Sequence, residues 1–436
     1  MLVGPLSERL RKRIRVGVVD FGPLSLRTVT RTGIEEGEEN VDTNPVIETL
    51  GRRLRLAVVG GGPGSFIGAM HRAAARIDDR YELVAGVLSS DPERSRLAAI
   101  AIGIEPDRAY SDAYTLIEAE AGREDGADVV AIMTPNDSHH AYSMAALDAG
   151  FDVICDKPIT NTIEEAMDVL AKVEETGLVF CLTHNYTGYP MVRQARAMVG
   201  SGELGEIRLV QVEYVQGGKA DESDPDPGEG LPWRYDPVRG GPSLVMGDIG
   251  THAHNLARFI TGLEVTEVAA EVGHIVPSRL VDDYAGALLR FSNGARGTFW
   301  VTQTAAGIEN ALRIRVSGTL GSLEWLQERP TRLRFNPLDG PAEVRTPNGP
   351  GTLPISARAT RIVSGHPEGF HEGFANVYSD AAEAIAARRA GLPVDPLALH
   401  FPNATDGALG VAFVDAAVAS SAANGAWTDA LGPFSD

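Results

Sequence analysis

Apolar residues follow two different patterns along the chain. In the first half, short and almost continuous apolar runs rich in β-branched residues are typical of strands buried on both faces of a sheet. These runs occupy residues 54–59, 81–87, 128–133, 151–155 and 178–182. Segments with helical spacing lie between them, for example 66–77 and 163–176. Strands and helices that alternate in this order predict a parallel sheet with right-handed crossovers.

From residue 207 onward, apolar and polar residues alternate with a period of two. This pattern is typical of antiparallel strands that bury one face and leave the other to solvent or to a covering helix. The alternating segments are 207–215, 268–272, 285–291, 298–302, 312–316 and 322–325, and helical patterns follow at 371–390 and 407–424. We therefore predict a second domain built on a large, mostly antiparallel open sheet.

The two patterns divide the chain into an α/β domain at residues 53–182 and a second α/β domain at residues 183–436. Whether the last helices pack on the first domain is left open. Residues 1–52 contain a candidate strand at 14–19 and an acidic stretch, and we interpret them as an N-terminal extension.

Composition mainly excludes classes of partner. The chain has 436 residues, which favours two domains, and a formal net charge of −20, which argues against nucleic acid and anionic membranes. No apolar stretch reaches the roughly 18 residues of a membrane span, and no signal-peptide core follows the basic N-terminus. Cys155 and Cys181 lie within apolar runs and are expected to be buried free thiols. We predict a cytoplasmic protein.

A glycine-rich loop separates the first strand from the helical pattern that begins at Phe66. Its sequence, Gly60-Gly61-Gly62-Pro63-Gly64-Ser65, supplies the first G-x-G of a dinucleotide-binding loop. Ser65 stands where the third glycine belongs, and Gly68 could take that role if three extra residues widen the loop. Such glycines let a pyrophosphate approach the backbone and the N-terminus of the helix, although a plain tight turn is an alternative. The loop predicts a Rossmann-type domain with cofactor contacts from Gly60, Gly62, Gly64, Ser65, Phe66 and Ile67.

Polar residues follow the other strands of the predicted parallel sheet. Asp156-Lys157-Pro158 follows the strand at 151–155, and Thr134-Pro135-Asn136 with His139 follows the strand at 128–133. Thr183-His184-Asn185-Tyr186 follows the strand at 178–182. Ligands bind at this carboxyl edge of doubly wound sheets, so these residues are candidates for cofactor and substrate contacts. A solvent-facing lysine before a proline turn is the alternative for Lys157.

Asp248 and His252 are four residues apart at the start of an apolar helix, so they are expected to share one face. A carboxylate beside an imidazole raises its basicity and orients it, which suits a general base. The alternative is an N-capping aspartate and a core histidine. His254 adds a superficial likeness to a metal site, but a further ligand at a recognisable spacing is lacking and we predict no metal.

Together these segments resemble one family over residues 53 to about 263: the Gfo/Idh/MocA oxidoreductases, which include glucose-fructose oxidoreductase and inositol dehydrogenase. The segments that carry the resemblance are Val59-Gly60-Gly61-Gly62, Thr134-Pro135-Asn136, Asp156-Lys157-Pro158 and Gly247-Asp248-Ile249-Gly250-Thr251-His252. Asp156 replaces the usual glutamate of the lysine motif, and the widened glycine loop is a larger departure. The subgroup that oxidises glycosides or anhydrosugars, some at the C3 hydroxyl, looks nearest.

The resemblance implies Lys157 and His252 as catalytic residues, with Asp248 orienting the substrate or the histidine. It also implies that Tyr186, Trp233 and Arg234 line a sugar pocket, and, with the open sheet, that the protein is a homo-oligomer. We expect a nicotinamide-dependent oxidoreductase that acts on a secondary hydroxyl of a sugar, glycoside or polyol. A dinucleotide-binding sensor or regulatory subunit without turnover is the alternative.

The choice between NAD and NADP depends on the residues after the second strand, Ser89-Ser90-Asp91-Pro92-Glu93-Arg94. An acidic residue there accepts a hydrogen bond from the ribose of NAD, whereas a basic one accommodates the phosphate of NADP. We predict NAD, with contacts from Ser89 and Asp91. Two alternatives remain: Ser89, Ser90 and Arg94 could hold a phosphate, or Asp91 could serve only as a helix N-cap.

Overall fold

The computed structural model describes residues 43–221, 224 and 230–435. The candidate strand at 14–19 lies outside the described residues, as do residues 222–223 and 225–229. Of the predicted extension, helix α2 (Pro45–Leu50) is described. Asn44 begins this helix by accepting hydrogen bonds from the N–H groups of Val46 and Ile47, and Gly51 ends it with a φ of 72°.

The first sheet has five parallel strands in the order β2-β1-β3-β4-β5. The strands are β1 (Leu54–Gly60), β2 (Tyr81–Val87), β3 (Val129–Met133), β4 (Asp152–Cys155) and β5 (Phe180–Leu182). Helices α3 (Phe66–Ile77), α4 (Pro92–Ala101), α5 (Ala113–Ala121), α6 (His139–Asp148) and α7 (Ile163–Thr176) connect them. Because the strand order reverses between β1 and β3, a crevice is expected at the carboxyl ends of these two strands.

The second sheet has nine strands in the order β13-β12-β11-β10-β6-β9-β8-β7-β14. All neighbours are antiparallel except β6 and β9, so the predicted fold class is confirmed. The strands are β6 (Ile207–Val215), β7 (Val265–Gly273), β8 (Tyr284–Phe291), β9 (Arg296–Thr302), β10 (Ala311–Gly318), β11 (Gly321–Leu326), β12 (Leu333–Pro337), β13 (Glu343–Arg345) and β14 (Thr428–Asp429).

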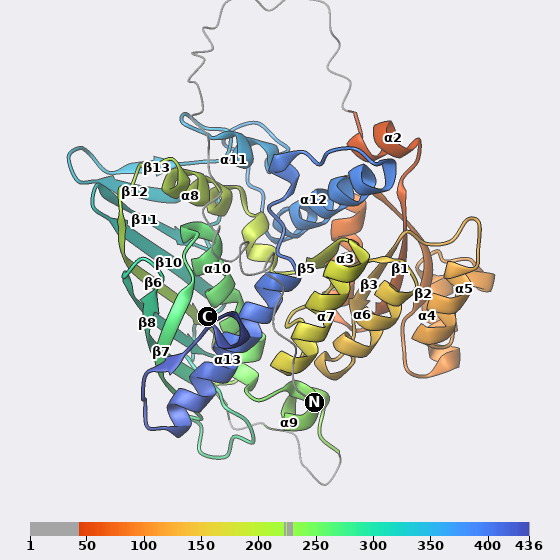
Figure 1. Ribbon diagram of the computed structural model, residues 1–436, viewed down its shortest axis with the longest axis horizontal. Helices are drawn as coiled ribbons and strands as arrows, with labels where there is room; N and C mark the ends of the chain where they lie inside the picture. The colour runs from red at the N-terminus through yellow and green to blue at the C-terminus, as the bar shows by residue number, and fades with distance from the viewer. Residues whose placement is uncertain (1–42, 222–223, 225–229, 436) are drawn as a thin grey trace, which may run out of the picture.

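Helices gather on one face of this large sheet and leave the other face open (Figure 1). The remaining helices are α8 (Pro190–Gly200), α9 (Pro237–Gly240), α10 (Thr251–Thr261), α11 (Pro354–Arg358), α12 (Phe370–Ala390) and α13 (Ala404–Ala422). Of these, α8, α10 and α13 contribute to the core beneath the sheet. Within the described part of the chain, no helix is long and apolar enough to cross a membrane.

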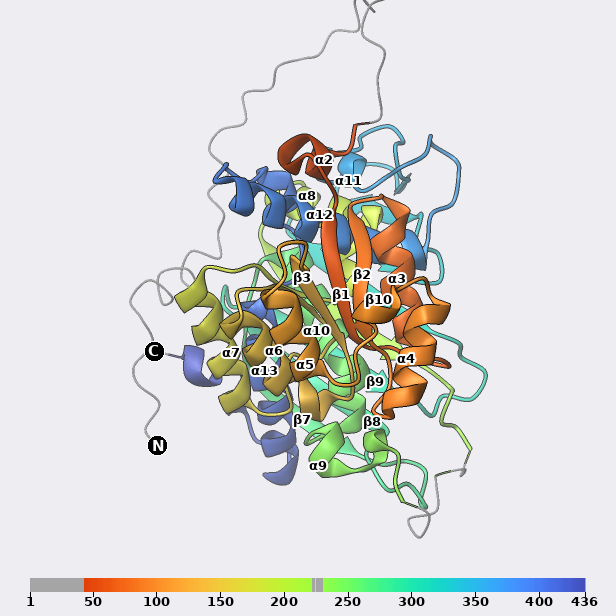
Figure 2. The same ribbon diagram turned by 90° about the vertical axis from the view of Figure 1, so that its right-hand side faces the viewer.

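The last two long helices pack against the first domain as well as the second. Phe374 and Tyr378 of α12 share a core with Leu56 of β1. Leu409 of α13 packs with the opposite face of the first sheet, whereas Phe413, one turn later, packs under the second sheet. Figure 2 shows α12 next to α2, at the upper end of β1. The end of the chain therefore joins the two sheets.

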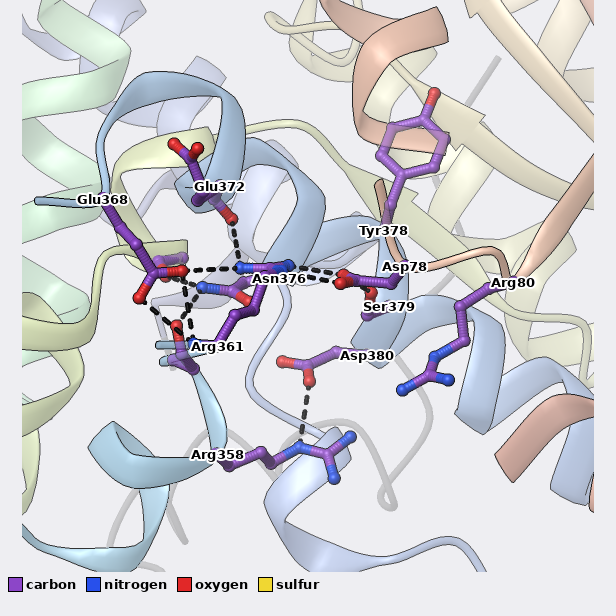
Figure 3. Close-up of polar contacts among 12 residues, drawn as sticks. Asp78, Arg80, Arg358, Arg361, Glu368, Glu372, Asn376, Tyr378, Ser379 and Asp380 are labelled. Atoms are coloured by element: carbon purple, nitrogen blue, oxygen red, sulfur yellow. Dashed lines mark hydrogen bonds and ion pairs between the residues drawn. The ribbon is translucent and has the colours of Figure 1, made fainter. Parts of the chain in front are cut away.

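Ion pairs add to this junction around α12 (Figure 3). Asp78, which ends α3, accepts hydrogen bonds from Arg361 at 2.6 Å and from Ser379 of α12 at 2.5 Å. Arg361 also pairs with Glu368, just before α12. Burial alone would raise the pKa of Asp78, but the hydrogen bond and charge of Arg361 outweigh it and lower that pKa. The charged carboxylate therefore stabilises the junction between α3 and α12.

A second, more deeply buried pair connects α12 to α8. Asp380 accepts a hydrogen bond from Arg193 of α8 at 2.6 Å and a longer one from Arg358 at 3.3 Å. The side chains of Arg193 and Asp380 are 1% and 3% exposed. Charges buried to this degree require partners, because water no longer solvates them.

Replacement of Asp380 by asparagine tests this junction. The change leaves Arg193 buried without its counter-charge, and removing one partner of a buried pair typically costs about 3–5 kcal/mol. We expect urea unfolding of Asp380→Asn to show a fall of about that size in the free energy of unfolding. The matched control is Asp79→Asn, which breaks the exposed pair with Arg53 and should change stability little. Equal effects of the two substitutions would contradict the importance of the buried pair.

Candidate active site

A cavity of about 1230 Å³ lies between the carboxyl ends of the first sheet's strands and the second domain. It is lined by the glycine loop, the segments that follow β2, β3 and β4, and residues from β6, the π-turn before α10 and the start of α12. The predicted site residues that line it are Gly60, Gly62, Ser65, Phe66, Ile67, Ser89, Thr134, Pro135, Asn136, Asp156, Lys157, Tyr186, Trp233, Arg234, Asp248 and His252.

The glycine loop has the backbone shape that a dinucleotide requires. Gly60 and Gly61 have φ values of 88° and 68°, which disfavour residues with side chains. A Cβ atom on Gly62 would lie 1.8 Å from the carbonyl oxygen of Leu88. A Cβ atom on Gly68 would lie 2.2 Å from the carbonyl oxygen of Gly61, so Gly68 permits the close packing of loop and helix that the third glycine usually provides. The loop and the N-terminus of α3 thus fit a pyrophosphate.

Three predicted cofactor residues are absent from the cavity wall: Gly64, Asp91 and His139. The carboxylate of Asp91 caps α4 by accepting a hydrogen bond from the N–H of Arg94 at 2.7 Å, which is the alternative that the sequence left open. Both ring nitrogens of the buried His139 contact backbone carbonyl oxygens, of Pro158 at 2.8 Å and of Thr134 at 3.0 Å. His139 holds the segments after β3 and β4 together, and its predicted contact with the cofactor stays a prediction.

Lys157 and Asp248 form an ion pair across the two domains. The ammonium of Lys157 donates to the backbone oxygen of Asp248 at 2.5 Å and to its Oδ1 at 3.0 Å. Gln303, just after β9, donates to Oδ2 of Asp248 at 2.8 Å. Burial alone would raise the pKa of Asp248, but Lys157, Arg234 and the hydrogen bond from Gln303 lower it to about 2. Asp248 is therefore ionised at neutral pH.

The predicted pairing of Asp248 with His252 was wrong. Asp248 lies in a π-helical turn, Met246–Gly250, and α10 begins only at Thr251. Both side chains line the same cavity, but Nδ1 of His252 contacts His184. The hydrogen bonds of the Asp248 carboxylate go to Lys157 and Gln303.

His252 instead lies among other rings. Its Nδ1 atom is 3.3 Å from Nδ1 of His184, and the ring of Tyr186 packs edge-on at 4.9 Å between centroids. Burial, followed by the positive charge of Lys157 and the neighbouring His184, lowers the pKa of His252 well below 6.5. Its imidazole is neutral at neutral pH and can accept a proton.

A chain of hydrogen bonds that the sequence did not predict continues from Asp248 along the second sheet. From Gln303, which contacts Asp248, it passes through Gln216, Asn310 and Tyr214 to Tyr186, with distances of 3.3, 2.6, 2.9 and 2.5 Å. Gln216 follows β6, Gln303 follows β9 and Asn310 precedes β10, so all three lie at one edge of the sheet. Polar residues at the ends of neighbouring strands, such as Gln216 and Asn310, could have predicted that this end of the second sheet lines the cavity.

Trp233 and Arg234 lie on a short 3₁₀ turn, Trp233–Tyr235, that reaches the cavity from the second domain. The guanidinium of Arg234 lies 4.3 Å from the centre of the Trp233 ring. Arg234 also lies near enough to Asp248 to lower its pKa. Among the residues described, no group of three or more His, Cys, Asp or Glu side chains is placed to hold a metal ion.

A dinucleotide loop at the switch point of a parallel sheet, facing an ion pair and a neutral histidine from a second domain, defines a two-domain nicotinamide-type oxidoreductase. Comparison with family models agrees: residues 54–184 match an oxidoreductase family with an NAD-binding Rossmann fold, and residues 192–324 match the GFO/IDH/MocA C-terminal domain. The chain belongs to the Gfo/Idh/MocA oxidoreductase family, so the resemblance seen in the sequence is confirmed.

Known relatives cover both domains. An oxidoreductase structure from Sinorhizobium meliloti is 46% identical, with a TM-score of 0.78, and the match covers 87% of this chain and all of that one (100%). An inositol dehydrogenase homologue from Azotobacter vinelandii, complexed with NADH and myo-inositol, is 35% identical, with a TM-score of 0.79 and coverage of 87% and 98%. Levoglucosan dehydrogenase of Pseudarthrobacter phenanthrenivorans is 28% identical over 87% of this chain and 98% of its own length.

Proposed function

We propose that this protein oxidises a secondary hydroxyl of a sugar, glycoside or polyol with NAD as the hydride acceptor. The observation that carries the proposal is that Lys157, Asp248 and the neutral His252 line the same cavity as the glycine loop. The inositol and levoglucosan dehydrogenases among the relatives support a polyhydroxylated substrate. Oxidation at C3 is the finer form of the proposal, taken from the subgroup that the sequence most resembles.

In the proposed reaction, His252 accepts the proton of the substrate hydroxyl while the carbon–oxygen bond becomes a carbonyl. The nicotinamide, when bound, supplies the acceptor for the hydride that leaves the same carbon. Lys157 donates a hydrogen bond to the reacting oxygen and stabilises its developing negative charge. Asp248 holds the ammonium of Lys157 in place through its Oδ1 and backbone oxygen.

The part of the cavity that is lined by residues at the end of the second sheet is suited to bind several hydroxyl groups. Tyr186, Tyr214, Gln216 and Asn310 line the cavity and are already joined by hydrogen bonds that fix their orientation. Amide and phenol groups both donate and accept hydrogen bonds, as hydroxyl groups do. A substrate with a row of hydroxyls is therefore favoured over a substrate with a single alcohol group.

The direct test is to mix the purified protein with NAD and a panel of polyols, sugars and glycosides and follow the absorbance of reduced nicotinamide. At least one compound should be oxidised, and His252→Ala should lower kcat by about two to four orders of magnitude, the usual value of a general base. Calorimetric titration should show unchanged affinity for NAD in this variant. Near-normal turnover by His252→Ala would show that another residue is the base. If the wild-type protein binds NAD but oxidises none of the compounds, the alternative of a dinucleotide-binding sensor without turnover is favoured.

Lys157 gives an independent test of charge stabilisation. Lys157→Ala should lower kcat more than it weakens NAD binding, because the ammonium acts on the reacting oxygen. Lys157→Arg should restore little activity, since a planar guanidinium does not reproduce a compact ammonium. Steady-state kinetics and NAD titration of the two variants check this expectation, and a fully active arginine variant would remove Lys157 from the proposed role.

The cofactor preference is also a proposal. The family description and the NADH complex of the Azotobacter relative support NAD. The Asp91 carboxylate, which we expected to bind the ribose of NAD, caps α4 instead. Ser89, Ser90 and Arg94 line the cavity, so the residues after β2 favour NAD less than the sequence indicated. We still expect NAD to bind at least about tenfold more tightly than NADP, which corresponds to about 1.4 kcal/mol.

Titration of both cofactors by calorimetry checks this expectation. Arg94→Ala is the matched variant: it should leave the dissociation constant for NAD unchanged and weaken residual NADP binding. Tighter binding of NADP than of NAD by the wild-type protein would overturn the preference and assign the phosphate to Ser89, Ser90 and Arg94.

The open face of the second sheet supports the proposal of a homo-oligomer. Leu209, Leu288 and Trp300, on adjacent strands β6, β8 and β9, are 55%, 54% and 42% exposed on this face. Such apolar patches commonly mark protein interfaces. Light scattering should give a multiple of the chain mass at micromolar concentration, and Trp300→Lys should reduce that mass. Leu97→Lys, at an exposed leucine of α4, is the control. A monomeric wild-type protein would contradict the proposal.

A further inference from the structure

Two histidines face each other at the cavity wall. The Nδ1 atoms of His184 and His252 are 3.3 Å apart, and their rings meet edge to face at 81° with centroids 5.1 Å apart. His252 lines the cavity, whereas His184 is absent from its wall and is only 2% exposed. His184 can therefore contact His252 but lies too far back to contact a ligand.

The contact between the two Nδ1 atoms requires a hydrogen on one of them and none on the other. Burial, together with the charges of Lys157 and Arg258, lowers the pKa of His184 to about 3, and the pKa of His252 is lowered in the same direction. Both rings are then neutral, and each carries one N–H group. Between two Nδ1 atoms at hydrogen-bond distance, one must donate and the other accept, so the tautomers of the two rings are linked.

We propose that His184 is a positioning residue that accepts a hydrogen bond from Nδ1 of His252 and thereby keeps an unprotonated Nε2 on His252. This inference rests on the proposed role of His252 as the base. In the opposite arrangement, His252 would carry its hydrogen on Nε2 and could not accept a proton there. During oxidation the substrate proton goes to Nε2, Nδ1 keeps its hydrogen, and His184 gains and loses nothing.

A neutral acceptor has a different effect from a carboxylate in the same place. A carboxylate would orient the ring but would also raise its pKa by favouring the charged form. His184 orients the ring while leaving the imidazole neutral. Because His252 is oriented by His184, the Asp248 carboxylate is available to pair with Lys157.

Matched substitutions of His184 test the proposal. Asparagine places a carbonyl oxygen close to the position of Nδ1, and leucine has the same branching without an acceptor. His184→Leu should lower kcat about tenfold or more with little change in KM, because part of the His252 population adopts the wrong tautomer. His184→Asn should recover most of that loss. If asparagine is no better than leucine, His184 has only a packing role and the proposal fails.

Nitrogen NMR of the full-length protein, without substrate, reads the tautomer directly. With uniform ¹⁵N labelling and His252→Gln to assign the signals, we expect His252 in the wild-type protein and in His184→Asn to be protonated at Nδ1. His184→Leu should show a mixture of tautomers. A wild-type His252 protonated at Nε2 overturns the proposal even if His184→Leu does not fold. Because this spectrum needs no turnover, the tautomer is judged separately from the proposed function, which fails if His252→Ala keeps normal turnover.

Discussion

The ion pair between Lys157 and Asp248 is the interaction on which the geometry of the site depends. It joins the carboxyl end of β4 in the first domain to the π-turn before α10 in the second. The side chain of Asp248 is only partly exposed, at 30%, and its carboxylate receives hydrogen bonds from both Lys157 and Gln303. Satisfying this one charge therefore fixes the segment before α10 against the edge of the first sheet.

Most of the fold could be predicted from the sequence because its strands and helices have strong periodic patterns. The edge strand β2 and the helices α3 and α7 have the expected bounds. Short strands such as β13 and β14 escaped prediction, because two or three residues carry no measurable period. The sequence also did not predict where α12 packs. The helix is buried on most of its circumference, so no apolar stripe indicates which sheet it contacts.

The sequence was enough to predict that residues at the strand ends lie around one cavity, but it did not predict which side chains pair across the two domains. Topology alone brings Thr134, Lys157 and Tyr186 to one edge. The partner of Asp248 was misassigned because Lys157 lies 91 residues away in the other domain, and spacing along one helix does not reveal such a contact. Asp91 was ambiguous for a related reason, since the carboxylate that could bind a ribose is the one that caps α4.

The packing of α12 on the first sheet restricts how far the two domains can move apart when a ligand enters. If the two domains moved apart about a hinge, Phe374 and Tyr378 would leave the apolar core that they share with β1, and the pair between Arg193 and Asp380 would be strained. Exposure of apolar surface costs about 25 cal/mol per Å², so wide opening is strongly disfavoured. We therefore expect ligands to enter and leave through movement of loops and side chains at the mouth of the cavity, while the two sheets keep their relative positions.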